Sequence, residues 1–212
     1  DVHIRSLVLD QIIGDGVTIR NLNALAKVQI DGGYIQIVDS RERNKGLWFE
    51  NGQGQITVSN LQITGENSST TSIGIYAQNQ PNIAIGDSVI VENIAFPVTV
   101  DKGCPRLSLA CTINGGTLRA RGHGAVTVEG ASQSTLRPKV TGLQGVWTAG
   151  VELLGAGHDR VNIDPTMVDP ASVSAGHKVV INGKPIPSSG HYDADGHRGA
   201  EGGGIVRAGI VA

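Results

Sequence analysis

The chain of 212 residues has few aromatic residues and no excess of positive charge. It holds two Trp, three Tyr and two Phe, and its 17 Lys and Arg are balanced by 19 Asp and Glu. Proteins that hold a nucleic-acid backbone usually carry a basic excess, so nucleic-acid binding is not expected. No apolar run approaches the roughly 18 residues of a membrane-spanning helix, so membrane insertion is not expected either.

Cysteine is also scarce. Cys104 and Cys111 are too few for a disulfide framework, and their spacing matches no zinc-binding motif. We therefore expect two reduced, buried thiols. Glycine, in contrast, accounts for 30 residues, about twice its usual share of ~7%. Abundant glycine with 39% hydrophobic residues and low charge argues against disorder and favours a turn-rich, all-β fold.

A short pattern recurs along the middle of the chain: a Gly, Pro or Ala, then an alternating apolar strand, then a polar turn. The first apolar residues of the copies stand at positions 47, 75, 98, 126 and 151, in steps of 28, 23, 28 and 25. A second strand follows each copy after 8 to 10 residues, and a third is partly visible. Such a period predicts a right-handed parallel β-helix, a single-stranded solenoid whose turns share one core. A β-sandwich is the competing fold, but hairpin turns between sequential strands are scarce.

Three copies of an apolar-x-apolar-x-Asn-apolar motif end at a bend. Their asparagines, Asn21, Asn60 and Asn93, share the parity of the apolar positions. We expect them to point inward, to bond the turn backbone and to stack on counterparts one turn away.

The sequence divides into two parts. Residues 1–164 carry the repeat and begin in a strand-like run, as expected of a coil cut from a longer one. Residues 165–212 are rich in Gly, Pro and His, and are expected to cap the open end of the coil or to contact other subunits. Within them, Asn182 and Gly183 predict the type I′ turn of a hairpin over 179–186.

The repeats over 46–163, the asparagine motif and the Gly-rich C-terminal segment resemble a bacteriophage tailspike of the pectate-lyase-like β-helix class. The resemblance implies a homotrimer in the phage tail that acts outside the cell, at the host surface. There it would bind a bacterial surface polysaccharide, capsule or lipopolysaccharide O-antigen, and in many cases depolymerise it. Two alternatives stay open: a structural trimeric stalk without catalysis, and a bacterial polysaccharide lyase or epimerase, which share the coil.

Aligning the turns predicts two outward columns on the first strand of each repeat. One column is Trp48, Tyr76, Thr99, Thr127 and Glu152, and the next is Glu50, Gln78, Asp101, Glu129 and Leu154. Because neighbouring turns are about 4.8 Å apart, Trp48 and Tyr76 would be adjacent aromatic rings suited to sugars, with Gln78 and Thr99 as polar neighbours. Packing against another subunit would explain the aromatic pair equally well.

The second column supplies the candidate catalytic carboxylates. Asp101 and Glu129 would lie one turn apart, near the ~5–5.5 Å of a retaining glycosidase pair. Glu50 and Asp101 would lie two turns apart, nearer the ~6.5–9.5 Å of an inverting pair. An ordinary solvated surface is the alternative. A lyase would instead need a base such as Arg119 or Arg121.

One candidate metal site is local in sequence. His191, Asp193, Asp195 and His197 place four possible ligands of a divalent metal ion within seven residues. A flexible polar loop is the alternative, and no other cofactor is expected.

Overall fold

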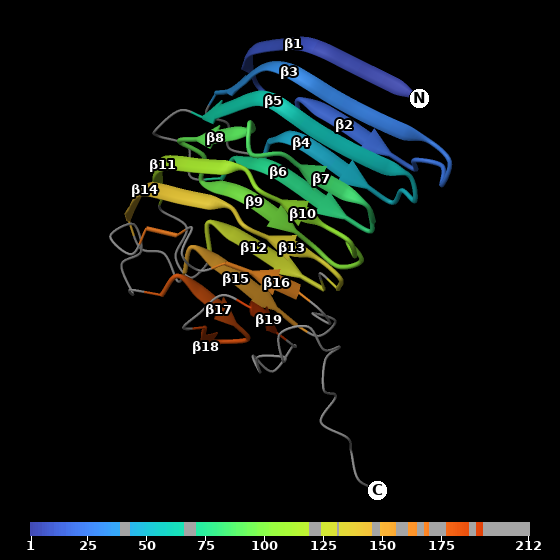
Figure 1. Ribbon diagram of the computed structural model, residues 1–212. Coiled ribbons are helices and arrows are strands. Elements are labelled where there is room, and N and C mark those ends of the chain that lie inside the picture. Colours follow the sequence, from blue (N-terminus) through green and yellow to red (C-terminus); the bar gives the residue numbers. More distant parts are fainter. Residues whose placement is uncertain are drawn as a thin grey trace, which may run out of the picture.

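The computed structural model describes residues 1–38, 43–65, 71–118, 124–130, 132–145, 149–155, 161–164, 168–169, 177–186 and 190–192, with the backbone alone for 115–118, 143–145 and 190–192. The described chain is all-β and winds into a parallel β-solenoid of about five turns (Figure 1). The solenoid architecture predicted from the repeat is thus confirmed. No helix in the described ranges has the length and apolar character that a membrane crossing requires.

One face of the solenoid is an eight-stranded sheet, called sheet B here. Neighbouring strands of this sheet pair in parallel, except for the final pair, β17–β18, which is antiparallel. In order along the sheet, the strands are β2 (Val17–Arg20), β4 (Lys45–Glu50), β6 (Ile73–Gln78), β9 (Phe96–Val100), β12 (Val126–Glu129), β15 (Val151–Leu154), β17 (Val179–Ile181) and β18 (Lys184–Pro185).

The remaining strands form an eleven-stranded sheet, called sheet A, which divides along its length. Its first strands are long: β1 (Val2–Ile12), β3 (Lys27–Ile37) and β5 (Gln55–Gly65). The start of β5 pairs with β7 and its end pairs with β8, so two shorter ladders follow. One ladder is β7 (Ile83–Ile85), β10 (Ser108–Leu109), β13 (Thr135–Leu136), β16 (Val161–Ile163) and β19 (Gly190–Tyr192). The other is β8 (Ile90–Glu92), β11 (Thr112–Leu118) and β14 (Lys139–Gly145). Later turns therefore include the third strand that was partly visible in the sequence.

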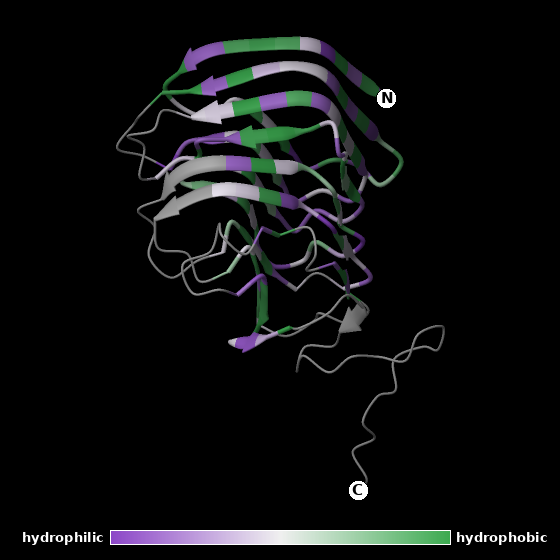
Figure 2. Ribbon diagram, turned by 60° about the vertical axis from the view of Figure 1, so that its left-hand side comes forward, coloured by the Kyte–Doolittle hydropathy of each residue, from purple (hydrophilic) through white to green (hydrophobic). Residues whose placement is uncertain are grey.

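The inner faces of the strands form one continuous apolar core. On sheet B, Leu47, Ile75, Val98, Val126 and Val151 lie in register, and each is at most 2% exposed. Figure 2 shows hydrophobic and hydrophilic bands alternating along the strands. Burying each such side chain contributes about 1.5–3 kcal/mol relative to leaving it exposed. The stack of turns, rather than any single turn, removes the apolar faces from water.

Several bends between strands are made by asparagines in the left-handed conformation, which Asn tolerates better than most residues. Asn21, Asn51 and Asn79 follow successive strands of sheet B with φ of 55°, 53° and 48°. Asn79 Nδ2 donates a hydrogen bond to Asn51 Oδ1 at 3.1 Å, so two asparagines outside the predicted motif link two turns.

The predicted inward direction of the motif asparagines is wrong. Asn21 and Asn60 are exposed and Asn93 is half-buried. All three have positive φ, at 55°, 52° and 54°. A left-handed residue breaks the two-residue alternation of a strand, so parity counted along the strand no longer predicts where its side chain points.

The first turn of the solenoid leaves apolar surface uncovered. In the described part of the chain, the large apolar side chains that are exposed are Val2, Val8, Ile13 and Leu25, at 54%, 70%, 80% and 90%. All four precede β3, and the one described strand that pairs with β1 is β3. The core is therefore less well covered at this end.

The C-terminal hairpin forms where the Asn-Gly pair predicts it. β17 and β18 pair antiparallel, and Asn182 and Gly183 have φ of 46° and 80°, as a type I′ turn requires. β19 pairs antiparallel with β16. Residues 193–212, with the Gly-rich end of the chain, lie outside the described residues, so their capping role stays a prediction.

Both cysteines are free and buried, as predicted. Burial raises the pKa of the Cys104 thiol to about 11 and that of Cys111 to about 12. Both side chains are therefore protonated at neutral pH and pack as small apolar groups.

Successive turns approach one another closely at Gly74, at the start of β6. A β-carbon there would lie 2.5 Å from the Pro97 carbonyl oxygen and 2.7 Å from Val91 Cγ1. The neighbouring turn cannot withdraw without disturbing the ladder. We therefore expect Gly74→Ala to lower the free energy of unfolding by about 1–3 kcal/mol, measured by chemical denaturation.

Gly86→Ala is the matched control. A β-carbon at Gly86 would lie 3.3 Å from the Val58 carbonyl oxygen and 3.7 Å from Ser88 Oγ, so we expect a smaller loss. Equal losses in both variants would show that the close approach at Gly74 does not limit the fold.

Candidate functional site

The outer face of sheet B carries both predicted columns in the predicted register. Strand pairing places each column residue beside its counterpart in the next turn. Asp101 lies beside Glu129 because the residues before them, Val100 and Val128, are paired. The columns are Trp48, Tyr76, Thr99, Thr127 and Glu152, and beside them Glu50, Gln78, Asp101, Glu129 and Leu154. The spacing of the repeat alone thus identified which side chains are neighbours.

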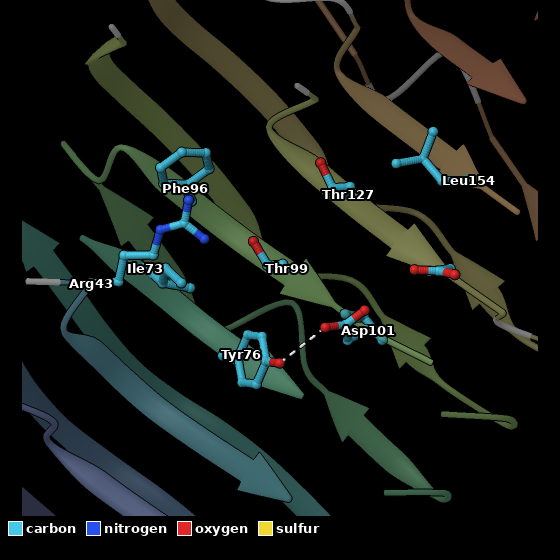
Figure 3. A pocket seen from close by; sticks show the side chains of 10 residues that line it. Arg43, Ile73, Tyr76, Phe96, Thr99, Asp101, Thr127 and Leu154 are labelled. Carbon is cyan, nitrogen blue, oxygen red and sulfur yellow. Dashed lines mark hydrogen bonds between the residues drawn. The ribbon is translucent and has the colours of Figure 1, made fainter. Parts of the chain in front are cut away.

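Four of the predicted site residues share one hollow with two other column residues, Thr127 and Leu154. Tyr76, Thr99, Asp101 and Glu129 line a space of about 270 Å³ on this face (Figure 3). The rest of its lining is Arg43, Ile73, Phe96, Val100, Thr127 and Leu154. Carboxylates, hydroxyls, a guanidinium and aromatic rings therefore border one space with partly apolar walls. Small-molecule sites typically combine apolar walls with a few such polar groups.

The Tyr76 hydroxyl joins the aromatic column to the carboxylate column. It lies 3.1 Å from Asp101 Oδ2 and 3.3 Å from Gln78 Oε1, and can donate its single proton to one of them at a time. Burial, followed by the hydrogen bond to Asp101, raises the pKa of Tyr76 to about 12. At neutral pH the hydroxyl is therefore a donor, and it fixes the Asp101 carboxylate at the edge of the hollow.

Trp48 lies beside Tyr76 but outside the hollow. The two ring centroids are 6.2 Å apart, with the planes at 80°. The guanidinium carbon of Arg20 lies 3.8 Å from the centre of the Trp48 ring, and Lys45 Nζ lies 3.9 Å from it. The indole Nε1 is buried and has no hydrogen-bond partner among the described residues. The Trp48 ring, which was predicted to contact a sugar, therefore makes cation–π contacts with Arg20 and Lys45 of its own chain.

The three candidate catalytic carboxylates have different surroundings. Glu50 Oε2 pairs with Arg20 Nε at 3.0 Å, and Glu50 lies outside the hollow. Glu129 Oε1 pairs with Lys102 Nζ at 3.3 Å, and Glu129 lines the hollow together with Asp101. The structure thus brings Asp101 and Glu129 together, one turn apart, and leaves Glu50 aside.

Glu152 belongs to the outward column by register but does not face solvent. It is 7% exposed, and its Oε2 accepts a hydrogen bond from the Gly124 backbone N–H at 3.0 Å. The expectation of a solvent-facing column is therefore wrong at this turn, because the chain at Gly124 covers the carboxylate.

The other predicted site residues lie outside the part of the chain that the structure describes. These are Asp193, Asp195, His197 and the side chain of His191, together with Arg119 and Arg121. Within the described part of the chain, no three His, Cys, Asp or Glu side chains gather as metal ligands would.

Reasoning from the sequence missed Arg43, Ile73 and Phe96. Ile73 pairs with Phe96, and strict alternation places both on the same side as the inward apolar residues two positions later. The alternation breaks at Gly74 and Pro97. Ile73 and Phe96, which precede these two residues, line the hollow, whereas Ile75 and Val98, which follow them, lie in the core. The small residue or proline at the start of every repeat copy is the signal that could have revealed this break. Nothing in the repeat pattern indicated Arg43, because this residue lies before β4, outside the strands that repeat.

Comparison with known proteins finds no matching family model, no matching curated protein and no matching solved structure. The resemblance to tailspikes therefore rests on the sequence alone: the repeat, the asparagine motif and the Gly-rich C-terminal segment.

The hydroxyl of Tyr76 provides a test of the site geometry. At pH 11 a tyrosine with the ordinary pKa of 10.0 is about nine-tenths ionised, whereas a pKa of about 12 leaves it about one-tenth ionised. In ultraviolet titration, we expect Tyr76 to contribute roughly one tyrosinate to the difference between the denatured and the folded chain at this pH. Tyr76→Phe should remove that contribution.

Circular dichroism at the same pH checks that the chain is still folded. Because the pKa of Tyr76 is higher in the folded state than in the unfolded state, its ionisation favours unfolding as the pH rises from 10 towards 12. A folded Tyr76→Phe chain that kept the late-ionising tyrosine would contradict the assigned hydrogen bond.

Proposed function

We propose that the chain binds a bacterial surface polysaccharide, capsule or O-antigen, on the outer face of sheet B, as part of a bacteriophage tailspike. The observation that carries the proposal is the hollow. In this proposal, Asp101 and Glu129 accept hydrogen bonds from sugar hydroxyls, and the Thr99 hydroxyl both donates and accepts them. The apolar face of a sugar ring packs on Tyr76 and Phe96. A solenoid face repeats its groups at every turn, which suits a ligand that is itself a repeating chain.

The hollow is preorganised for such a ligand. Its walls stand on paired strands, and the Asp101 carboxylate is already fixed by Tyr76. Little side-chain freedom is lost on binding, so more of the interaction energy contributes to affinity.

One observation favours catalysis as a second function of the same site. Asp101 and Glu129 border one hollow from adjacent turns, and turns about 4.8 Å apart approach the roughly 5–5.5 Å of retaining glycosidase pairs. In such a reaction one carboxylic acid protonates the glycosidic oxygen while the other carboxylate attacks the sugar carbon. Water then releases the sugar from the enzyme. The chain would then depolymerise the polysaccharide that it binds.

Binding to a panel of purified capsular and O-antigen polysaccharides, both acidic and neutral, tests the proposal. We expect at least one to bind, and Asp101→Ala or Glu129→Ala each to weaken that binding about tenfold, since hydrogen bonds to charged groups contribute about 1.5 kcal/mol or more. Calorimetry measures the affinity. Asp87→Ala is the matched control, because it removes an exposed carboxylate between β7 and β8, away from sheet B.

Product analysis in the same mixtures separates the alternatives. New reducing ends that disappear in both variants indicate a glycoside hydrolase, and unsaturated ends indicate a lyase. Binding without cleavage indicates a recognition protein. Failure of every polysaccharide to bind would refute the proposal and favour a structural stalk.

We propose further that three right-handed coils assemble side by side in the virion, with residues 165–212 contacting or capping them. Light scattering tests this assembly without any assumption about the glycan. The trimer predicts three times the chain mass of 22.0 kDa. A mass of 22.0 kDa would contradict the trimer of this chain and would leave the hollow as a site within one subunit.

A further inference from the structure

The two ends of the hollow carry opposite charge. Asp101 and Glu129 stand at the C-terminal ends of β9 and β12. Arg43 stands at the other end, beside Phe96, which begins β9 (Figure 3). The six residues from Phe96 to Asp101 make five steps along the chain, which span about 16 Å at the usual rise of a strand. A ligand that contacts both ends is therefore longer than one sugar ring.

Arg43 is an exposed cation without a carboxylate partner in the described part of the chain. Its guanidinium carbon lies 6.0 Å from the centre of the Phe96 ring. The nearby cations are engaged differently: Lys45 lies over Trp48, and Lys102 pairs with Glu129. A guanidinium can bind a carboxylate through two parallel hydrogen bonds, which an ammonium cannot do. Since Arg43 has no carboxylate partner among the described residues, it offers the hollow an anion-binding group.

We propose that the hollow selects an acidic glycan, one that carries a carboxylate on a sugar residue seated at Arg43. This inference rests on the proposed glycan binding and adds the substrate class. The part of the glycan that lies at Asp101 and Glu129 presents neutral hydroxyls, because a second carboxylate there would be repelled by Asp101. Charge complementarity thus fixes both the class of the glycan and its direction across β9.

Removal of the negative charge from the glycan tests the inference directly. The probes are purified acidic capsular polysaccharides and hyaluronate, in which acidic and neutral sugars alternate, each beside its carboxyl-reduced form, together with neutral O-antigen polysaccharides. We expect the acidic form of a bound glycan to bind about tenfold more tightly than its reduced form, and this preference to weaken as salt is raised.

Variants of Arg43 assign the preference to this side chain. Arg43→Gln is expected to remove most of the tenfold preference while changing the affinity for the reduced form little. Arg43→Lys should recover part of it, since the charge returns without the paired donors. Arg137→Gln is the matched control, because it removes an exposed arginine between β13 and β14, away from the hollow. Thermal unfolding checks that each variant is folded.

The outcomes distinguish this inference from the function on which it rests. Equal binding of acidic and reduced forms, or binding to neutral polysaccharides alone, would overturn the acid preference and leave glycan binding intact. A preference that survives in Arg43→Gln would overturn the role of Arg43. If no probe bound in either form, the proposed glycan binding would fail together with the inference.

Discussion

The parallel backbone ladder between successive turns is the interaction on which the rest of this structure depends. It sets the turns about 4.8 Å apart and pairs each residue with its counterpart in the next repeat. Inward residues consequently stack into one core from Leu47 to Val151, and outward residues stack into the columns through Tyr76 and Asp101. A change in register would move the core side chains to the surface along the whole strand, so the core and the site depend on the same pairing.

The ladder also restricts the residues that fit where the turns crowd together. At Gly74 the neighbouring turn leaves no room for a β-carbon, and at the ends of the sheet B strands the backbone takes positive φ at Asn51 and Asn79. These positions interrupt the strand alternation. Asn51 and Asn79 follow the ends of their strands, whereas Gly74 lies near the start of β6, and each interruption redirects the side chains on either side. Ile73 and Phe96 line the hollow because of such an interruption.

This explains which parts of the structure the sequence could predict. Period, strand alternation and the neighbours within each column follow from backbone geometry that every turn repeats, so the pairing of Trp48 with Tyr76 was predictable. The direction of Asn60 was mispredicted because its positive φ breaks the alternation that counting along a strand assumes. The covering of Glu152 by Gly124 and the reach of Arg43 depend on loops that differ from one turn to the next. No periodic pattern contains them.

The hollow itself results from a step in side-chain size along one column. Aromatic residues occupy the turns at Trp48 and Tyr76, and threonines occupy the next two, at Thr99 and Thr127. Because the ladder holds the backbone at even spacing, the smaller side chains leave space that the core cannot close. Tyr76 remains as one wall, and the carboxylates at the strand ends border the same space. A flat sheet face thus gains a site wherever small residues follow large ones in register, and the charges at its two ends then decide which ligand fits.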